Sequence, residues 1–95
     1  MEDGGGIPTS WTLERNYPNP FNPSTTIPLE LDRTTHARLE VYNLLGKRMT
    51  TLNDGVLAAG RHQFRLDAAS WTSGTYLIRL TTDSGVQSLP LTLLK

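Results

Sequence analysis

The sequence predicts an all-β fold, an immunoglobulin-like antiparallel β-sandwich of about seven strands, on three observations. No segment of a dozen residues has a convincing helical apolar period. Apolar residues instead recur at every second position, as they do in half-buried strands. Gly, Asn-Asp and Pro interrupt these stretches at spacings of about 8–12 residues, which is typical of sandwiches. The Cys and Trp marks of an antibody domain are missing, so the likeness concerns architecture only.

Five stretches alternate clearly enough to assign their inward residues. The predicted inward sets are Ile27, Leu29 and Leu31; Ala37, Leu39 and Val41; His62, Phe64 and Leu66; Tyr76, Ile78 and Leu80; and Leu89, Leu91 and Leu93. Arg38 and Glu40 are expected to face outward between their apolar neighbours. The stretch 47–52 is less regular because Met49 and Leu52 have opposite parity, and a β-bulge would reconcile them.

Turn residues separate these stretches. The expected reversals are Asn43–Gly46, Asn53–Gly55, Ala59–Gly60 and Asp83–Gly85. Two prolines lie inside predicted strands, Pro28 in the first and Pro90 in the last. Because proline cannot donate to a ladder, we expect each at a sheet edge with its nitrogen facing outward.

The densest local signal is Asn16-Tyr17-Pro18-Asn19-Pro20-Phe21-Asn22-Pro23. Three closely spaced prolines prevent a helix and favour an extended, polyproline-like path. One interpretation is a rigid recognition surface with Tyr17 and Phe21 as anchors. The other is a segment that crosses the end of the sandwich and fills the core with Trp11, Tyr17 and Phe21. The residues themselves leave both open.

Length and charge limit the possible functions. The 95 residues suit one domain, which we place at 11–95 after a linker or added segment at 1–10 that contains three glycines. Nine Lys and Arg balance nine Asp and Glu, so neither nucleic acid nor an anionic membrane is an expected partner. No apolar run is long enough to span a membrane. With no cysteine, disulfides and thiolate chemistry are excluded.

A search for catalytic groups finds little. His36 and His62 lie on separate predicted strands with no second ligand at metal spacing. No Gly-x-Ser-x-Gly elbow supports a nucleophile, and no glycine-rich phosphate loop has the required strand-to-helix context. We therefore predict no catalytic, cofactor-binding or metal-binding residues, no cofactor and no enzymatic activity.

Two non-catalytic alternatives remain from the residues alone. A carbohydrate-binding module would use exposed aromatic rings, for which Trp11, Trp71 and Tyr76 are candidates. Against this, Trp71 can equally pack into the core beneath the loop 68–74. An inert spacer domain is the other alternative.

Four motifs in register resemble the type A C-terminal sorting domain of the type IX secretion system of Bacteroidetes. The first is Leu13 followed by Asn16–Thr26, the proline-rich box. The others are Val41-Tyr42-Asn43-Leu44-Leu45-Gly46, Ala59-Gly60-Arg61-His62 and Ser73-Gly74-Thr75-Tyr76, before a final apolar strand closed by Leu93-Leu94-Lys95. Together they cover nearly the whole chain.

The resemblance implies a secretion address without chemistry of its own. A covalently attached cargo would precede the domain and enter the periplasm of a Gram-negative bacterium by a separate signal. The outer-membrane translocon and its shuttle components would then recognise the domain, and a surface sortase would remove it, leaving cargo secreted or on the cell surface. The expected contact residues are Asn19, Pro20, Phe21, Tyr42, Asn43, Gly46, Leu93, Leu94 and Lys95.

Overall fold

The computed structural model describes residues 11–95, which form seven strands and no helix. The strands are β1 (Thr12–Leu13), β2 (Ser24–Leu31), β3 (Thr35–Asn43), β4 (Arg48–Leu57), β5 (Gly60–Asp67), β6 (Gly74–Thr82) and β7 (Gly85–Leu93). The expected linker or added segment at 1–10 lies outside the described residues. Within 11–95 there is consequently no helix that could cross a membrane.

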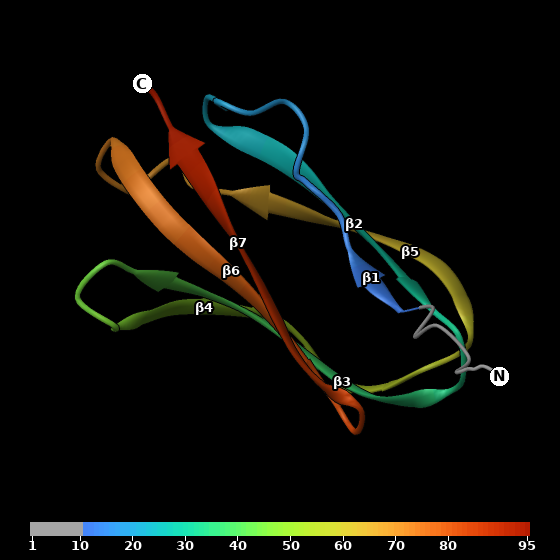
Figure 1. Cartoon of the computed structure of the whole chain (residues 1–95). Helices are drawn as coiled ribbons and strands as arrows, with labels where there is room; N and C mark the ends of the chain where they lie inside the picture. The colour runs from blue at the N-terminus through green and yellow to red at the C-terminus, as the bar shows by residue number, and fades with distance from the viewer. Residues whose placement is uncertain (1–10) are drawn as a thin grey trace, which may run out of the picture.

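The strands form two antiparallel sheets that pack against each other (Figure 1). One sheet has the order β1-β2-β5 and the other β4-β3-β6-β7, so the chain changes sheet after β2, β4 and β5. The predicted all-β sandwich is confirmed. Its core lies between the sheets, because each strand directs alternate side chains to the interior.

The predicted inward residues make up most of this core. All of them are buried except His62, Phe64 and Leu89, which are half-buried. Phe64 and Leu89 still pack against the buried cluster, whereas the His62 ring lies 2.8 Å from the Ala58 carbonyl oxygen. Alternation in the sequence therefore identified the inner face of each of these strands.

Glu40 differs from its prediction. It lies on the outer face of β3, as its parity requires, but only 2% of its surface is exposed. The Tyr42 hydroxyl donates to its Oε1 at 2.9 Å, and Arg38 and Arg48 reach the carboxylate at 3.3 Å each. These neighbours cover the carboxylate, so an outward residue is buried without entering the core. Arg38 itself is exposed, as expected.

Strand β4 contains the predicted irregularity, but in two places. Leu39 pairs with Asn53 and Glu40 pairs with Thr51, so Leu52 has no partner on β3 and forms the first bulge. The register shifts again between Val41 and Tyr42, and there Met49 has no partner on β3. Each extra residue changes the parity of the strand, so both side chains pack against the same core.

The reversal expected at Asn53–Gly55 is wrong, because these residues continue β4 and pair with β3. The Asn53 amide donates to the Ala37 carbonyl oxygen of the neighbouring strand at 2.9 Å, so a turn-forming side chain here supports the ladder. The chain reverses later, at Ala58–Ala59, before Gly60 with φ of 122°. The other expected turns are present.

The two strand prolines occupy different environments. Pro90 is exposed on β7, an edge strand, as predicted. Pro28 is buried on β2, the central strand of its sheet, so the edge prediction is wrong for it. Its carbonyl accepts from Glu14 N–H at 3.0 Å just beyond the end of β1, and its nitrogen points to the same side. The proline nitrogen, which carries no hydrogen, therefore faces a position just beyond the end of β1.

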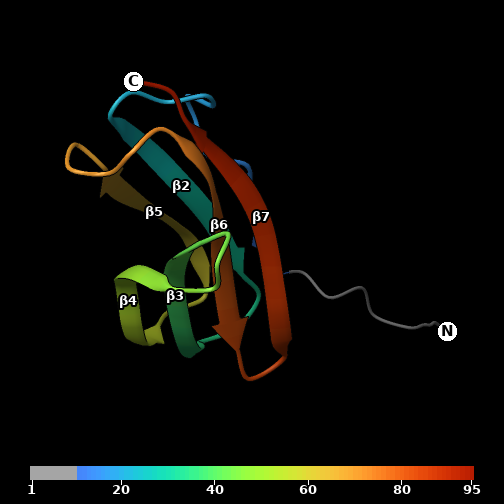
Figure 2. The same cartoon turned by 90° about the vertical axis from the view of Figure 1, so that its left-hand side faces the viewer.

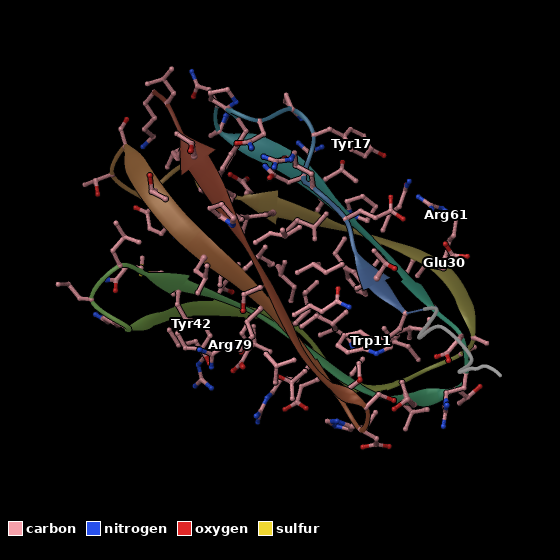
Figure 3. The ribbon with its side chains drawn as sticks, viewed as in Figure 1. Trp11, Tyr17, Glu30, Tyr42, Arg61 and Arg79 are labelled. Atoms are coloured by element: carbon pink, nitrogen blue, oxygen red, sulfur yellow. The ribbon has the colours of Figure 1, made fainter. Side chains whose placement is uncertain are left out.

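An exposed ion pair ties the end of β1 to β5 across β2. Arg61 donates to both carboxylate oxygens of Glu14, at 2.8 and 3.3 Å, and lies 3.7 Å from Glu30. Figure 3 shows Arg61 and Glu30 together on the outer face of this sheet. The hydrogen bond to Glu14 raises the pKa of the Arg61 guanidinium, which is charged at neutral pH in any case.

Candidate recognition surface at one end of the sandwich

The proline-rich box is bent, not extended as predicted. Tyr17 pairs with Thr26 on β2, and the chain then bends and reaches β7, where Phe21 forms a parallel bridge with Leu93. The bends are held from inside, because the Asn16 amide donates to Thr25 Oγ1 at 3.0 Å and Thr25 donates to the Pro18 carbonyl at 2.9 Å. The peptide bonds preceding Pro18, Pro20 and Pro23 are cis. The box thus connects the two sheets at one end.

The box covers the outer edge of the last strand. Phe21 N–H donates to the Thr92 carbonyl and Leu94 N–H donates to the Phe21 carbonyl, both at 3.0 Å. The Asn19 side chain supplies a third bond by accepting from Thr92 N–H at 3.2 Å. An added strand from a partner would have to displace these bonds, because the box already occupies the end of the β7 edge.

The terminal residues bind the β5–β6 loop. Lys95 N–H donates to Ser73 Oγ at 3.0 Å, and the Lys95 ammonium group donates to the Ala69 carbonyl. Leu94 precedes Lys95 and is itself bonded through its N–H to Phe21, but 60% of its surface is exposed. The chain end is therefore positioned, with one apolar side chain facing solvent.

The β3–β4 loop is a second rigid element at this end. Asn43 Oδ1 accepts from the N–H groups of Leu45 and Lys47, both at 2.9 Å, and Gly46 adopts the positive φ (85°) that the turn requires. This turn directs two consecutive leucines into solvent. Leu44 and Leu45 are 73% and 93% exposed, which is unusual for side chains of this size.

A pocket of about 470 Å³ separates this loop from the β5–β6 loop. Its lining comprises Asn43, Leu44, Leu45, Met49 and the segment 70–76. The wall is stiffened by Tyr76, whose hydroxyl donates to the Thr72 carbonyl at 2.6 Å and whose ring lies 5.0 Å from that of Trp71. Figure 2 views this end, with the box and the C-terminus at the top, the β3–β4 loop lower down, and the β5–β6 loop between them.

Comparison with known families assigns the chain that carries these motifs to a family. Residues 15–91 match the family model described as the secretion system C-terminal sorting domain. The chain belongs to this family. It therefore carries a C-terminal sorting signal of type IX secretion, and the protein that bears it is secreted or lies at the cell surface. No curated protein matches the chain.

The sorting domain does not offer the aromatic platform that a carbohydrate-binding module needs. Trp11 and Tyr76 are buried, and Trp71 is half-buried against the core, in the position expected beneath the loop 68–74. The carbohydrate-binding alternative is accordingly not favoured. Sorting-signal families are not catalytic. Within residues 11–95, no three His, Asp or Glu side chains lie close enough to hold a metal ion.

Of the nine expected contact residues, the structure brings most to this end but exposes only some of them. Phe21 and Leu93 are buried, so they fill the core where the box meets β7. Asn19, Asn43 and Gly46 organise backbone. The exposed members are Pro20, Gly46, Leu94 and Lys95.

Two tyrosines lie apart from these groups. Tyr42 projects from the outer face of the four-stranded sheet beside Arg79, as Figure 3 shows, and it is not among the residues that line the pocket. Tyr17 is 51% exposed, so the expectation that it fills the core is wrong, whereas Trp11 and Phe21 do fill it. A backbone pairing with Thr26 holds Tyr17 at the sheet edge, and its ring is left in solvent.

The sequence placed Leu44 and Leu45 inside the expected contact loop 42–46 but did not single them out, and it assigned no role to Ser73 or Thr92. A signal for the leucines was present, because Asn-Leu-Leu-Gly is a tight turn whose central residues cannot both point inward. Ser73 belongs to one of the four motifs, but the motif indicated no contact for it, and no sequence pattern pointed to Thr92. Their roles depend on pairing with residues more than 20 positions away.

Proposed function

We propose that the sorting domain presents this end of the sandwich to the secretion machinery. The proposed surface consists of the two leucines of the β3–β4 loop, the pocket beside them, and Leu94 with Lys95. The family match supports the role, and the convergence of separated motifs on one end supports the location. The single observation that carries the proposal is the pair of exposed leucines on a turn that their own neighbour, Asn43, makes rigid.

The nine expected contact residues divide by task in this proposal. Pro20, Leu94 and Lys95 contact the machinery directly. Asn19, Phe21 and Leu93 hold the last strand in place, and Asn43 and Gly46 shape the leucine loop. Tyr42 lies on a neighbouring surface, the outer face of the four-stranded sheet. A fixed apolar surface loses little conformational entropy on binding, so it suits recognition of a folded domain.

The route follows from the resemblance of the motifs. The domain, residues 11–95, is the sorting unit, and residues 1–10 link it to a cargo. Cargo and domain cross the periplasm, the translocon and shuttle components bind the domain, and a surface sortase removes it. The domain carries no catalysis in this scheme, and any activity belongs to the cargo.

The test is export of a reporter fused before residues 7–95 in a host competent for type IX secretion. The double change Leu44→Ser, Leu45→Ser should retain the reporter inside the cell, because it removes the apolar surface without touching the core. Stability should change by less than about 0.5 kcal/mol, as for other exposed positions. Cell fractionation and thermal melts measure the two effects.

Val56→Ser with Val86→Ser is the matched control. Both valines are exposed, at 69% and 58%, and both belong to strand segments at the opposite end of the sheet. This variant should be exported normally. Normal export of the leucine variant would refute the proposed surface, and retention of the unchanged fusion would refute the sorting function of the chain itself.

A further inference from the structure

On the outer face of the four-stranded sheet, two arginines contact one carboxylate, and a third stacks on a tyrosine that is hydrogen-bonded to that carboxylate. Arg38 and Glu40 come from β3, Arg48 from β4 and Arg79 from β6, and Tyr42 lies in their midst. Figure 3 shows Tyr42 and Arg79 together on this face. The neutral net charge of the chain hides this concentration of positive charge.

The carboxylate of Glu40 is fully used inside the cluster. Its Oε1 accepts from the Tyr42 hydroxyl at 2.9 Å and lies 3.3 Å from Arg38 Nε, while its Oε2 accepts from Arg48 at 3.3 Å. The two arginine side chains are each about half exposed, although the Glu40 side chain is almost fully buried. Glu40 thus holds two guanidinium groups in place while their remaining N–H groups point toward solvent.

Arg79 is held in a different way. Its guanidinium carbon lies 4.6 Å from the centre of the Tyr42 ring, a cation–π contact. In register it lies opposite Glu40, yet no carboxylate among residues 11–95 is within ion-pair distance of it. The stacking fixes the position of the guanidinium, and no hydrogen bond from it to another of residues 11–95 is found.

The cluster therefore carries excess positive charge. It contains one carboxylate and three guanidinium groups. Asp54 lies opposite Arg38 in the ladder, and its Oδ1 contacts the His36 ring at 3.1 Å. Fixed guanidinium groups with free donors are the groups that best bind oxyanions in two-pronged geometry.

We propose that this face binds the carboxylates of an acidic segment of a protein partner. The inference rests on the proposed function, because recognition by secretion machinery requires protein partners. Arg48 and Arg79 come from the strands on either side of β3, and Arg38 comes from β3 itself, so the three guanidinium groups belong to three adjacent strands. An extended segment presents neighbouring carboxylates on one face about 7 Å apart, so it can contact more than one of these groups.

The test is an NMR titration of the full chain, observing arginine side-chain Nε–H signals. The probes are hexaglutamate, hexaglutamine and inorganic phosphate. Hexaglutamate should shift the signals of Arg38, Arg48 and Arg79 selectively, and the shifts should weaken as salt rises. Hexaglutamine should shift none of them. Phosphate binding these arginines as tightly as hexaglutamate would overturn the assignment to a protein segment.

A matched pair of variants separates a site from general charge attraction. Arg48→Gln with Arg79→Gln should weaken hexaglutamate binding by roughly tenfold, since each exposed charge contact contributes modestly. Arg33→Gln with Arg65→Gln removes the same charge elsewhere and should leave the affinity within about twofold. Equal weakening by both double variants would overturn the proposal.

Export of the same reporter fusion distinguishes this inference from the sorting function. Failed export of the unchanged fusion would count against the function. Normal export together with absent hexaglutamate binding would count only against the arginine face. Reduced export of the Arg48–Arg79 variant, with the Arg33–Arg65 variant unaffected, is the expected result.

Discussion

The Asn19 side chain helps to hold the last strand of the chain in place. It lies in a segment dominated by proline, and its amide oxygen accepts from Thr92 N–H on the last strand. Without that acceptor, the backbone donor of an edge strand would need another partner, because unpaired backbone donors are costly when water is excluded. The neighbouring Asn22 is exposed, and no side-chain hydrogen bond from it is found within residues 11–95. Two asparagines of one motif therefore have different tasks.

Asn19→Ala should lower the free energy of unfolding by about 1–3 kcal/mol, since Thr92 N–H loses its partner. Hydrogen exchange at Thr92 should also become faster. Urea unfolding and amide exchange by NMR measure these effects. Asn22→Ala is the control and should stay within about 0.5 kcal/mol of the unchanged protein. Similar losses in both variants would show that the Asn19–Thr92 bond contributes nothing specific.

At the scale of elements, β7 ends on a core residue, and the residue that follows it lies at the surface. Leu93 is completely buried, whereas Leu94 faces solvent at the end of the sandwich that contains the pocket. Alternation along a strand produces this division, because successive side chains point to opposite faces. Removal of 93–95 as a unit would mix the two roles, so single substitutions are the informative changes.

Leu93→Ala should cost about 2–5 kcal/mol, as other buried leucine truncations do, and lower the melting temperature clearly. Leu94→Ala should leave the melting temperature almost unchanged and still reduce reporter export. Calorimetry and cell fractionation provide the readouts. Export that falls only in parallel with melting temperature would mean that the terminal residues serve stability alone.

The strand β4 shows where sequence patterns fall short at this scale. The parity conflict between Met49 and Leu52 predicted a bulge, and the strand has two. The turn signal at Asn53–Gly55 predicted a reversal, yet the strand continues through it. Local turn preference is weak compared with a complete ladder to β3, so tertiary pairing overrides it.

For the whole molecule, the segment before β2 completes the sandwich. Trp11, Leu13 and Phe21 are buried in the core, and the box joins β2 to β7. Small domains bury too little surface to lose three large side chains, because their net stability is only about 5–15 kcal/mol. The box is therefore part of the fold as well as a sequence motif.

A chain that begins at Ser24 should fail to fold, because it loses three buried side chains of roughly 2–3 kcal/mol each. A chain that begins at Trp11 should unfold at the same urea concentration as the full chain, in agreement with a linker at 1–10. Circular dichroism and urea titration test both. A cooperative transition in the shorter chain would show that the box is dispensable for the sandwich.

The sequence alone determined the fold class, the inner face of five strands and the family, because these depend on period-two patterning and on motifs that are local in the chain. It also indicated the motif residues that meet at one end. Only the tertiary structure decided the burial of Glu40, the exposure of Tyr17 and the central position of Pro28. Each depends on a neighbour that only the folded chain brings into contact: Arg48, Thr26 and Glu14, respectively. The arginine face has the same origin, since its charges come from three strands that only the folded sheet places side by side.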